Sequence, residues 1–253
     1  MQQSRILLML LCMCGTLALP AFAQKQNQSL AIEDALAALS FHPQMPLDLS
    51  PDSQWVAYAL IDPRRNILPD DKYPFFTRTG VPTGMSGYDI WITNTKSGES
   101  KNLTGGKGSS WGPVWSPDGN HLAFYSDRSG QAHLWLWERS SRRLKQLTDL
   151  VVHPFYGFEV VRWTPDSRKI VVKVLPEGIS LEDAAKVTTP SQGHANNEEK
   201  YPGSTARIYR SPEAQNSVRP APWMKESTGD LALIDVSGGK AQRIGHGIRP
   251  RGV

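Results

Sequence analysis

The amino-acid sequence predicts an all-β protein made of β-propeller blades, about three four-stranded blades that form an incomplete ring. The first observation is a tetrad of Ser or Thr, Pro, Asp and a small residue, which occurs three times ahead of a β-branched or aromatic run. The second is a strand–turn–strand pattern after each tetrad. The third is the spacing between tetrads, which is typical of propeller blades of ~40–45 residues.

The chain begins with a segment typical of a secretory signal peptide. Arg5 precedes an apolar run over 6–19, and Ala21-Phe22-Ala23 fits an A-x-A cleavage site, so we expect residues 1–23 to be removed. Both cysteines, Cys12 and Cys14, leave with this segment. An exported chain without disulfides is typical of a bacterial periplasm or exterior. No later segment is apolar enough to span a membrane, so we expect no membrane contact after cleavage.

Residues 24–46 form an N-terminal segment with a predicted short helix from Ser29 to Leu39. Ile32, Leu36 and Leu39 share one helical face, and Ser29 is a suitable N-cap. The partial propeller follows over 47–253.

The three tetrads each suit a type I turn. Ser or Thr is favoured at the first position and Pro, with its fixed φ, at the second, while Asp at the third can accept hydrogen bonds from the local backbone. The repeat-turn residues are Ser50-Pro51-Asp52, Ser116-Pro117-Asp118-Gly119 and Thr164-Pro165-Asp166.

A hairpin follows each turn and its first strand. The predicted strand pairs are 88–92 with 102–104, 132–137 with 146–148, and 230–234 with 242–244. Within the middle pair, Leu134 and Leu136 alternate with Trp135 and Trp137, the period-two pattern of a strand.

The spacing of the tetrads sets the expected blade boundaries. Pro117 and Pro165 lie 48 positions apart, whereas the 66 positions from Pro51 to Pro117 include an insertion. The predicted blades are about 47–106, 107–150 and 157–247, with insertions over 61–87 and 176–228, the second of which holds one possible helical turn at 181–184. A closed propeller has four to eight blades. We therefore expect the chain to be an N-terminal piece of a longer protein, or to assemble with further blades.

The charge and the scattered histidines exclude several function classes. The net charge is +4 without a basic stripe, which argues against a nucleic-acid partner. The histidines, none at metal-ligand spacing, are expected on the surface or in turns, and we predict no metal and no cofactor. They are His42, His121, His133, His153, His194 and His246. The strand tryptophans are expected to pack between blades. They are Trp91, Trp115, Trp135, Trp137 and Trp163.

The N-terminal layout resembles that of the prolyl oligopeptidase family of serine peptidases, which includes dipeptidyl-peptidases and acylaminoacyl-peptidases. The resemblance rests on the run 30–36, the run 47–52 and Val56-Ala57-Tyr58, and it extends over about 29–247 together with TolB-type repeats. It implies a propeller that filters peptide substrates by size and supports a C-terminal α/β-hydrolase domain. That domain, which holds the family's catalytic triad, is absent from this chain, so no catalytic residue is placed here.

Two strings imitate catalytic motifs of such enzymes. Gly108-Ser109-Ser110-Trp111-Gly112 fits G-x-S-x-G, but a nucleophile elbow needs a helix after Ser110, and a predicted strand follows instead. Glu198-Glu199 could imitate the propeller Glu pair by which dipeptidyl-peptidases hold a substrate amine. The aromatic residues expected around such a pair are missing, so a solvated loop pair is the better interpretation.

Two functions remain open at the level of the sequence. The first is the propeller segment of an exported prolyl-oligopeptidase-like serine peptidase. The alternative is a non-enzymatic, TolB-like periplasmic propeller that binds protein or peptide. Only residues 24–47 separate the cleavage site from the first blade, which favours the peptidase because TolB-type proteins carry a larger domain there. A carbohydrate-cleaving propeller would need a carboxylate pair that we cannot place. The substrate-binding residues and the oligomeric state are not predicted.

Overall fold

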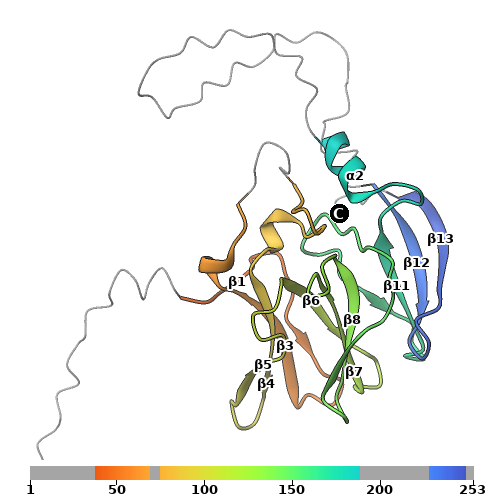
Figure 1. The fold of residues 1–253 in the computed structure, drawn as a ribbon. Helices are drawn as coiled ribbons and strands as arrows, with labels where there is room; N and C mark the ends of the chain where they lie inside the picture. Colours follow the sequence, from red (N-terminus) through yellow and green to blue (C-terminus); the bar gives the residue numbers. More distant parts are fainter. Residues whose placement is uncertain (1–37, 69–74, 189–227, 249–253) are drawn as a thin grey trace, which may run out of the picture.

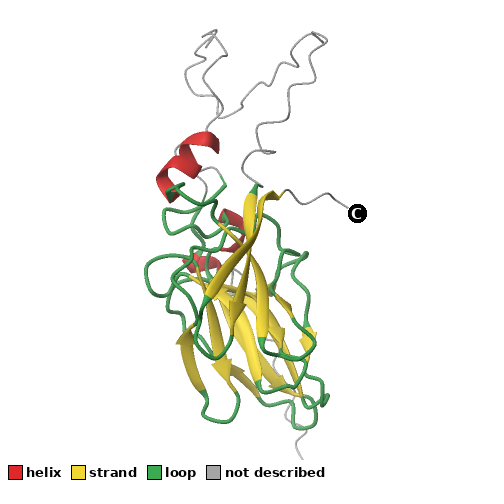
Figure 2. Ribbon diagram, turned by 90° about the vertical axis from the view of Figure 1, so that its right-hand side faces the viewer, coloured by secondary structure: helices red, strands yellow, loops and turns green. Residues whose placement is uncertain are grey.

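The structure, a computed structural model, describes residues 38–68, 75–188 and 228–248, which form three antiparallel sheets (Figures 1 and 2). The first sheet contains β1 (Ser40–Phe41), β2 (Asp48–Leu49), β3 (Trp55–Ile61), β4 (Tyr88–Asn94) and β5 (Ser100–Asn102). The second contains β6 (Ser110–Trp115), β7 (His121–Ser126), β8 (His133–Glu138) and β9 (Arg143–Gln146). The third contains β10 (Arg162–Trp163), β11 (Lys169–Val174), β12 (Gly229–Asp235) and β13 (Ala241–Ile248).

Each sheet is a propeller blade, in which strands pair in chain order. The second and third sheets have the orders β6-β7-β8-β9 and β10-β11-β12-β13. In the first sheet, β1 and β2 pair successively along the same edge of β3, ahead of β4 and β5. The predicted all-β fold of propeller blades is confirmed.

Among the described residues, helical structure is confined to short connections. They are η1 (Pro63–Arg65), η2 (Thr83–Met85) and α2 (Leu181–Thr188), and α2 includes the predicted helical turn at 181–184. The signal peptide lies outside the described residues, as does most of the helix predicted over 29–39, whose last residue, Leu39, is not helical. Within the described ranges, no helix combines the length and apolar character needed to cross a lipid bilayer.

One apolar core runs through all three sheets. Alternate residues of the central strands are buried, as expected when side chains point to opposite faces of a strand. These residues include Ala57, Ala59, Ile90, Ile92, Leu122, Phe124, Ile170, Val172, Ala232 and Ile234. The five predicted strand tryptophans lie on strands, and four of them, Trp115, Trp135, Trp137 and Trp163, belong to this core or pack against it. Trp115 and Trp137 meet edge to face at 6.0 Å, and the Trp163 indole N–H donates to the Val114 carbonyl of the neighbouring blade at 3.2 Å.

The outer strands of the first two blades end earlier than the sequence predicts. β5 stops at Asn102 and β9 at Gln146, so Leu103-Thr104 and Leu147-Thr148 lie beyond them. Thr104 leaves the ladder because its hydroxyl accepts from the Ile90 N–H at 3.0 Å and donates to Asp89 at 2.7 Å. A side-chain hydrogen bond here competes with regular strand pairing.

The three tetrads fold into the same hydrogen-bonded turn. The fourth residue donates its N–H to the carbonyl of the first at 2.7, 2.8 and 2.9 Å in the order of the chain. The first hydroxyl donates to the Asp carboxylate at 2.6, 2.5 and 2.6 Å. It also accepts from the N–H of the sixth residue at 2.9, 3.0 and 3.0 Å. Each turn thus joins the two innermost strands of its blade through one buried or half-buried hydroxyl.

The fourth turn position needs a left-handed backbone. Its φ is 57° at Ser53, 71° at Gly119 and 59° at Ser167. Glycine adopts this conformation without strain, whereas the two serines adopt it at a cost that their turn hydrogen bonds offset.

Neighbouring turns also contact one another. Arg139 of the second blade pairs with Asp52 of the first turn at 2.8 Å and lies 6.0 Å from the Trp115 ring. The Asp118 N–H of the second turn donates to Ser167 Oγ of the third at 3.0 Å. The tetrads therefore link successive blades as well as strands within a blade.

Replacing Ser116 by Ala should lower the free energy of unfolding by about 1–3 kcal/mol, because the His121 N–H loses its buried acceptor. Urea denaturation measures this change. Ser140→Ala, at an exposed residue, is the control and should change stability little. Equal effects of the two substitutions would contradict the role assigned to the turn hydroxyl.

The first turn should give stability a defined pH dependence. The Ser50 hydroxyl, the Gln54 N–H and Arg139 lower the pKa of Asp52 to about 2, against ~3.9 in an unfolded chain. A carboxyl with a depressed pKa stabilises the fold above about pH 4, and this stabilisation is lost as the pH falls toward 2. Denaturation of wild type and Asp52→Asn should therefore show a stability gap at pH 6 that closes on acidification. A gap that stays constant down to pH 2 would contradict this prediction, and Glu99→Gln is the matched control.

Candidate functional site

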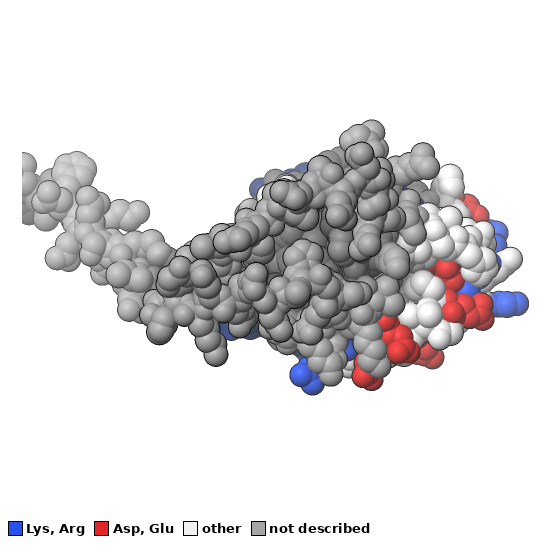
Figure 3. All heavy atoms as spheres, turned by 90° about the horizontal axis from the view of Figure 1, so that it is seen from above, with Lys and Arg blue, Asp and Glu red and all other residues white. Residues whose placement is uncertain are grey.

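The long connections of the fold emerge at one end, opposite the tetrad turns (Figures 1 and 2). The β3–β4 connection and the β11–β12 connection, which carries α2, both leave from this end. The short β4–β5, β8–β9 and β12–β13 hairpins lie at the other end with the tetrads. In repeat proteins, insertions gather on one face that is often the binding face. We call this end the insertion face, and both acidic and basic side chains are visible along its described rim (Figure 3).

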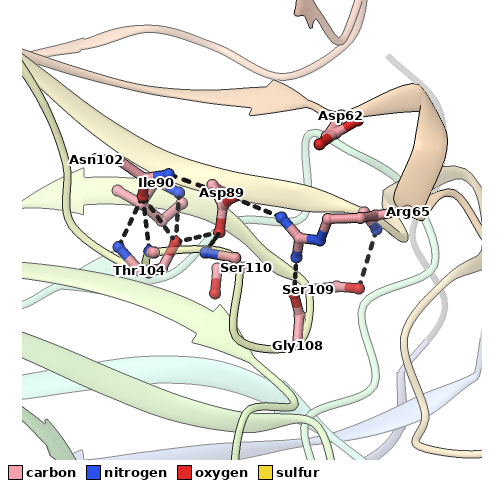
Figure 4. Close-up of polar contacts among 12 residues, drawn as sticks. Asp62, Arg65, Asp89, Ile90, Asn102, Thr104, Gly108, Ser109 and Ser110 are labelled. Carbon is pink, nitrogen blue, oxygen red and sulfur yellow. Dashed lines mark hydrogen bonds and ion pairs between the residues drawn. The ribbon is translucent and has the colours of Figure 1, made fainter. Parts of the chain in front are cut away.

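A buried carboxylate near the start of β4 organises the first blade at this face (Figure 4). Asp89 forms a 2.6 Å ion pair with Arg65, which comes from η1 in the β3–β4 connection. It also accepts from the Thr104 hydroxyl at 2.7 Å and the Gly106 N–H at 3.0 Å. Arg65 in turn donates to the Gly108 carbonyl. One carboxylate thereby fixes the insertion and the connection to the next blade.

The third blade has a similar carboxylate, paired with an arginine, near the start of β12. Asp230 pairs with Arg243 at 2.7 Å and accepts from the Gly247 N–H at 3.1 Å and the Glu177 N–H at 3.2 Å. Although burial alone would raise the pKa of Asp230, these hydrogen bonds, that of His246 and the charge of Arg243 lower it below its ordinary value. Asp230, held ionised by these donors, acts as a structural anchor and is poorly suited to proton transfer at neutral pH.

A third carboxylate joins the first two blades. Asp127 accepts from the Ser109 N–H at 2.6 Å and from the Thr79 hydroxyl at 2.7 Å. Thr79 belongs to the β3–β4 connection, while Ser109 precedes β6 and its hydroxyl accepts from the Gly87 N–H at 3.0 Å. The β3–β4 connection is therefore bound to the second blade at two points.

An aromatic loop lies between β9 and β10 on the same face. Tyr156 and Phe158 stack with their centroids 5.1 Å apart and an interplanar angle of 7°. Phe155 contacts Tyr156 edge to face at 4.8 Å and also meets Phe75 of the β3–β4 connection at 5.8 Å. Because Phe158 remains 48% exposed, the loop presents an aromatic surface to solvent.

A buried ion pair holds this aromatic loop. Glu159 accepts from the N–H groups of Phe155 and Tyr156 and pairs with Lys173 of β11 at 2.9 Å. The side chains of Glu159 and Lys173 are only 11% and 7% exposed. Burial lowers the pKa of Lys173, and the charge of Glu159 opposes that shift. The pair fixes the loop from the middle of the third blade.

The residues singled out from the sequence lie elsewhere. All three tetrads are at the opposite end of the blades. Ser110 is buried on β6, and its hydroxyl donates to Ser126 Oγ at 2.8 Å, which fits the interpretation of G-x-S-x-G as a chance match on a strand. Glu198 and Glu199 lie outside the described residues. The described chain contains no group of three or more His, Cys, Asp or Glu placed to hold a metal.

The expectation of surface or turn histidines is wrong at two positions. His133 and His153 are 7% and 3% exposed. His153 is covered because its ring stacks on Phe76 at 4.5 Å, and His133 is a strand residue of β8 whose Nδ1 meets Ser129 Oγ at 3.1 Å. Both are enclosed by the connections of the insertion face, which sequence spacing alone does not place.

Sequence reasoning missed the anchors of the insertion face. Asp89 and Asp230 occupy the same position near the start of β4 and β12, and the sequence pattern predicts both only as strand residues. Their repetition at equivalent blade positions is a signal that could have found them. Glu159 and Lys173 carry no such signal, because only the fold brings a loop residue and a strand residue together.

Comparisons with known proteins give partial matches, one of them to a peptidase. No protein-family model matches the chain. Over 127 residues, 49% of the chain, it is 37% identical to YuxL, an uncharacterized peptidase of Bacillus subtilis. The chain resembles part of a peptidase. A second relative, an uncharacterized protein of Agrobacterium fabrum, is 32% identical over 103 residues. The matches span 19% and 32% of the two relatives' lengths, so the activity of a whole relative is a proposal for this chain.

Solved structures similar to this chain include a TolB protein and an acylaminoacyl peptidase. TolB from Agrobacterium tumefaciens matches with a TM-score of 0.40 and 19% identity, over 82% of this chain and 54% of TolB. An acylaminoacyl peptidase from Pyrococcus horikoshii matches with a TM-score of 0.45 and 14% identity, over 84% of this chain and 26% of the peptidase. The blade architecture itself follows from the three sheets.

The Glu159–Lys173 pair should be strongly coupled. Lys173→Met leaves a buried carboxylate without its cation and should destabilise the fold by about 3–5 kcal/mol. The double variant Lys173→Met with Glu159→Gln removes both charges and should recover part of that loss. Urea denaturation of the four proteins in this cycle gives the coupling, and additive effects of the two substitutions would contradict the pairing.

Proposed function

We propose that this chain is the propeller segment of an exported serine peptidase of the prolyl oligopeptidase type. In this proposal the propeller controls which peptides reach the active site and supports a hydrolase domain that lies outside these residues. The observation that carries the proposal is the 37% identity to a peptidase over half of the chain. The A-x-A site at Ala21-Phe22-Ala23 supports export.

The insertion face offers a physical basis for substrate control. The described parts of its connections are held by the carboxylates of Asp89, Asp127 and Asp230, so the ends of neighbouring blades are held in a defined arrangement. The aromatic loop adds an exposed ring, Phe158, to which an unfolded peptide could bind. In this proposal, the face restricts bulky substrates while extended peptides pass. No described residue is assigned to bond cleavage.

The proposal predicts activity and size selection in the protein encoded by the complete gene. Reading the gene past codon 253 should reveal further blades followed by a strand, a G-x-S-x-G motif and a helix. The encoded protein should hydrolyse short peptides and cleave folded proteins poorly, because the propeller restricts access. Ser110→Ala should leave hydrolysis unchanged, since this hydroxyl is buried in a blade.

Two outcomes would contradict the proposal. One is a frame that encodes no hydrolase domain, together with peptide binding that occurs without cleavage, which is the behaviour of a binding propeller. The other is loss of hydrolysis in a correctly folded Ser110→Ala variant.

A further inference from the structure

A cavity of about 290 Å³ lies between the second and third blades, near the hairpin end. It is lined by His121, Leu136, Glu138, Arg143, Leu144, Lys145 and Val236. Val236 comes from the β12–β13 turn of the third blade, and the other residues come from strands of the second. The cavity is distant from the insertion face, and the proposed peptidase function does not use it.

The strand register places charged side chains of both signs on one wall. His121 pairs with Glu138, and Glu138 pairs with Arg143, so these residues form a row across β7, β8 and β9. Lys145 pairs with Leu136 in an adjacent row. Side chains of directly paired residues project from the same face with Cβ atoms ~4.5–5.5 Å apart. The row and the adjacent Lys145 therefore bring two cations, Arg143 and Lys145, and the Glu138 carboxylate to a common surface.

Glu138, Arg143 and Lys145 are exposed, and no direct ion pair joins them. Among the described residues, neither Arg143 nor Lys145 takes part in an ion pair, and Nδ1 of His121 is buried without a hydrogen-bond partner. Oε2 of Glu138 accepts from the Ser141 hydroxyl. A buried ring nitrogen without a partner is costly, and a ligand or water that bonds to it removes the cost.

The remaining wall of the cavity is apolar, which restricts the chemistry of the ligand further. Leu136 is buried and Val236 is half-buried, and both contribute aliphatic surface. A ligand that matches this wall and the charged row carries an ammonium for Glu138, a carboxylate for Arg143 and Lys145, and a short aliphatic chain. The volume suits a molecule smaller than the drug-sized ligands of ~300–1,000 Å³ pockets.

We propose that this cavity binds a free aliphatic α-amino acid as its zwitterion. Glu138 receives the ammonium, Arg143 and Lys145 receive the carboxylate, and the side chain packs against Leu136 and Val236. This site does not depend on the proposed function, because all of its lining residues lie in the second and third blades and none belongs to the insertion face.

Calorimetric titration of the full chain with three related compounds tests the proposal. Leucine carries both charges, N-acetyl-leucine lacks the ammonium, and 3-methylbutylamine lacks the carboxylate. Leucine should bind about tenfold more tightly than either analogue, because each lost charge removes a charge-assisted hydrogen bond. The His121 ring resonances should shift during the leucine titration.

Substitutions test separately the recognition of the ammonium and that of the carboxylate. Glu138→Gln should abolish the preference for leucine over N-acetyl-leucine, and Lys145→Met should reduce the preference for leucine over 3-methylbutylamine. Lys101→Met is the matched control, because Lys101 pairs with Ile92 in the first blade as Lys145 pairs with Leu136 in the second. No binding of leucine, equal binding of the three compounds, or an equal effect of Lys101→Met would overturn the proposal.

Discussion

The packing of buried strand faces between neighbouring sheets is the interaction on which the rest of this structure depends. The central strands of the blades place their buried residues in the single core cluster that runs through all three sheets. The second blade contributes most to this core because it has a blade on either side, and Leu122, Phe124 and Leu134 are fully buried. Apolar burial of this kind is the dominant stabilising contribution in folding. It also explains why isolated blades are not expected to be stable.

Polar contacts at the two ends of the blades give this apolar packing its geometry. At one end the tetrad turns repeat one hydrogen-bond pattern and contact the next blade, as in the Asp52–Arg139 pair. At the other end Asp89 and Asp230 anchor the long connections. The two ends are therefore held in different ways. Short, repeated turns leave little room for variation, whereas anchored connections can vary in length and chemistry without disturbing the core.

Local sequence patterns made the blades predictable, whereas features that depend on long-range contacts could not be predicted. The Ser/Thr-Pro-Asp tetrads encode turns through the preferences of single residues, and the alternation of Leu134 to Trp137 encodes a strand. The strand end at Asn102 was missed because the Thr104 hydroxyl takes the place of a ladder hydrogen bond there. The burial of His133 and His153 and the Glu159–Lys173 pair depend on connections that meet only after folding. Sequence spacing carries no information about such contacts.

Native-state hydrogen exchange tests most directly whether inter-blade packing governs this fold. Amide exchange is measured strand by strand at increasing denaturant concentration. If burial between sheets is the controlling interaction, the slowest amides should lie in β7 and β8, which are covered from both sides, and those of β3, β4, β11 and β12 should exchange faster. Slower exchange in the first or third blade than in the second would contradict this account.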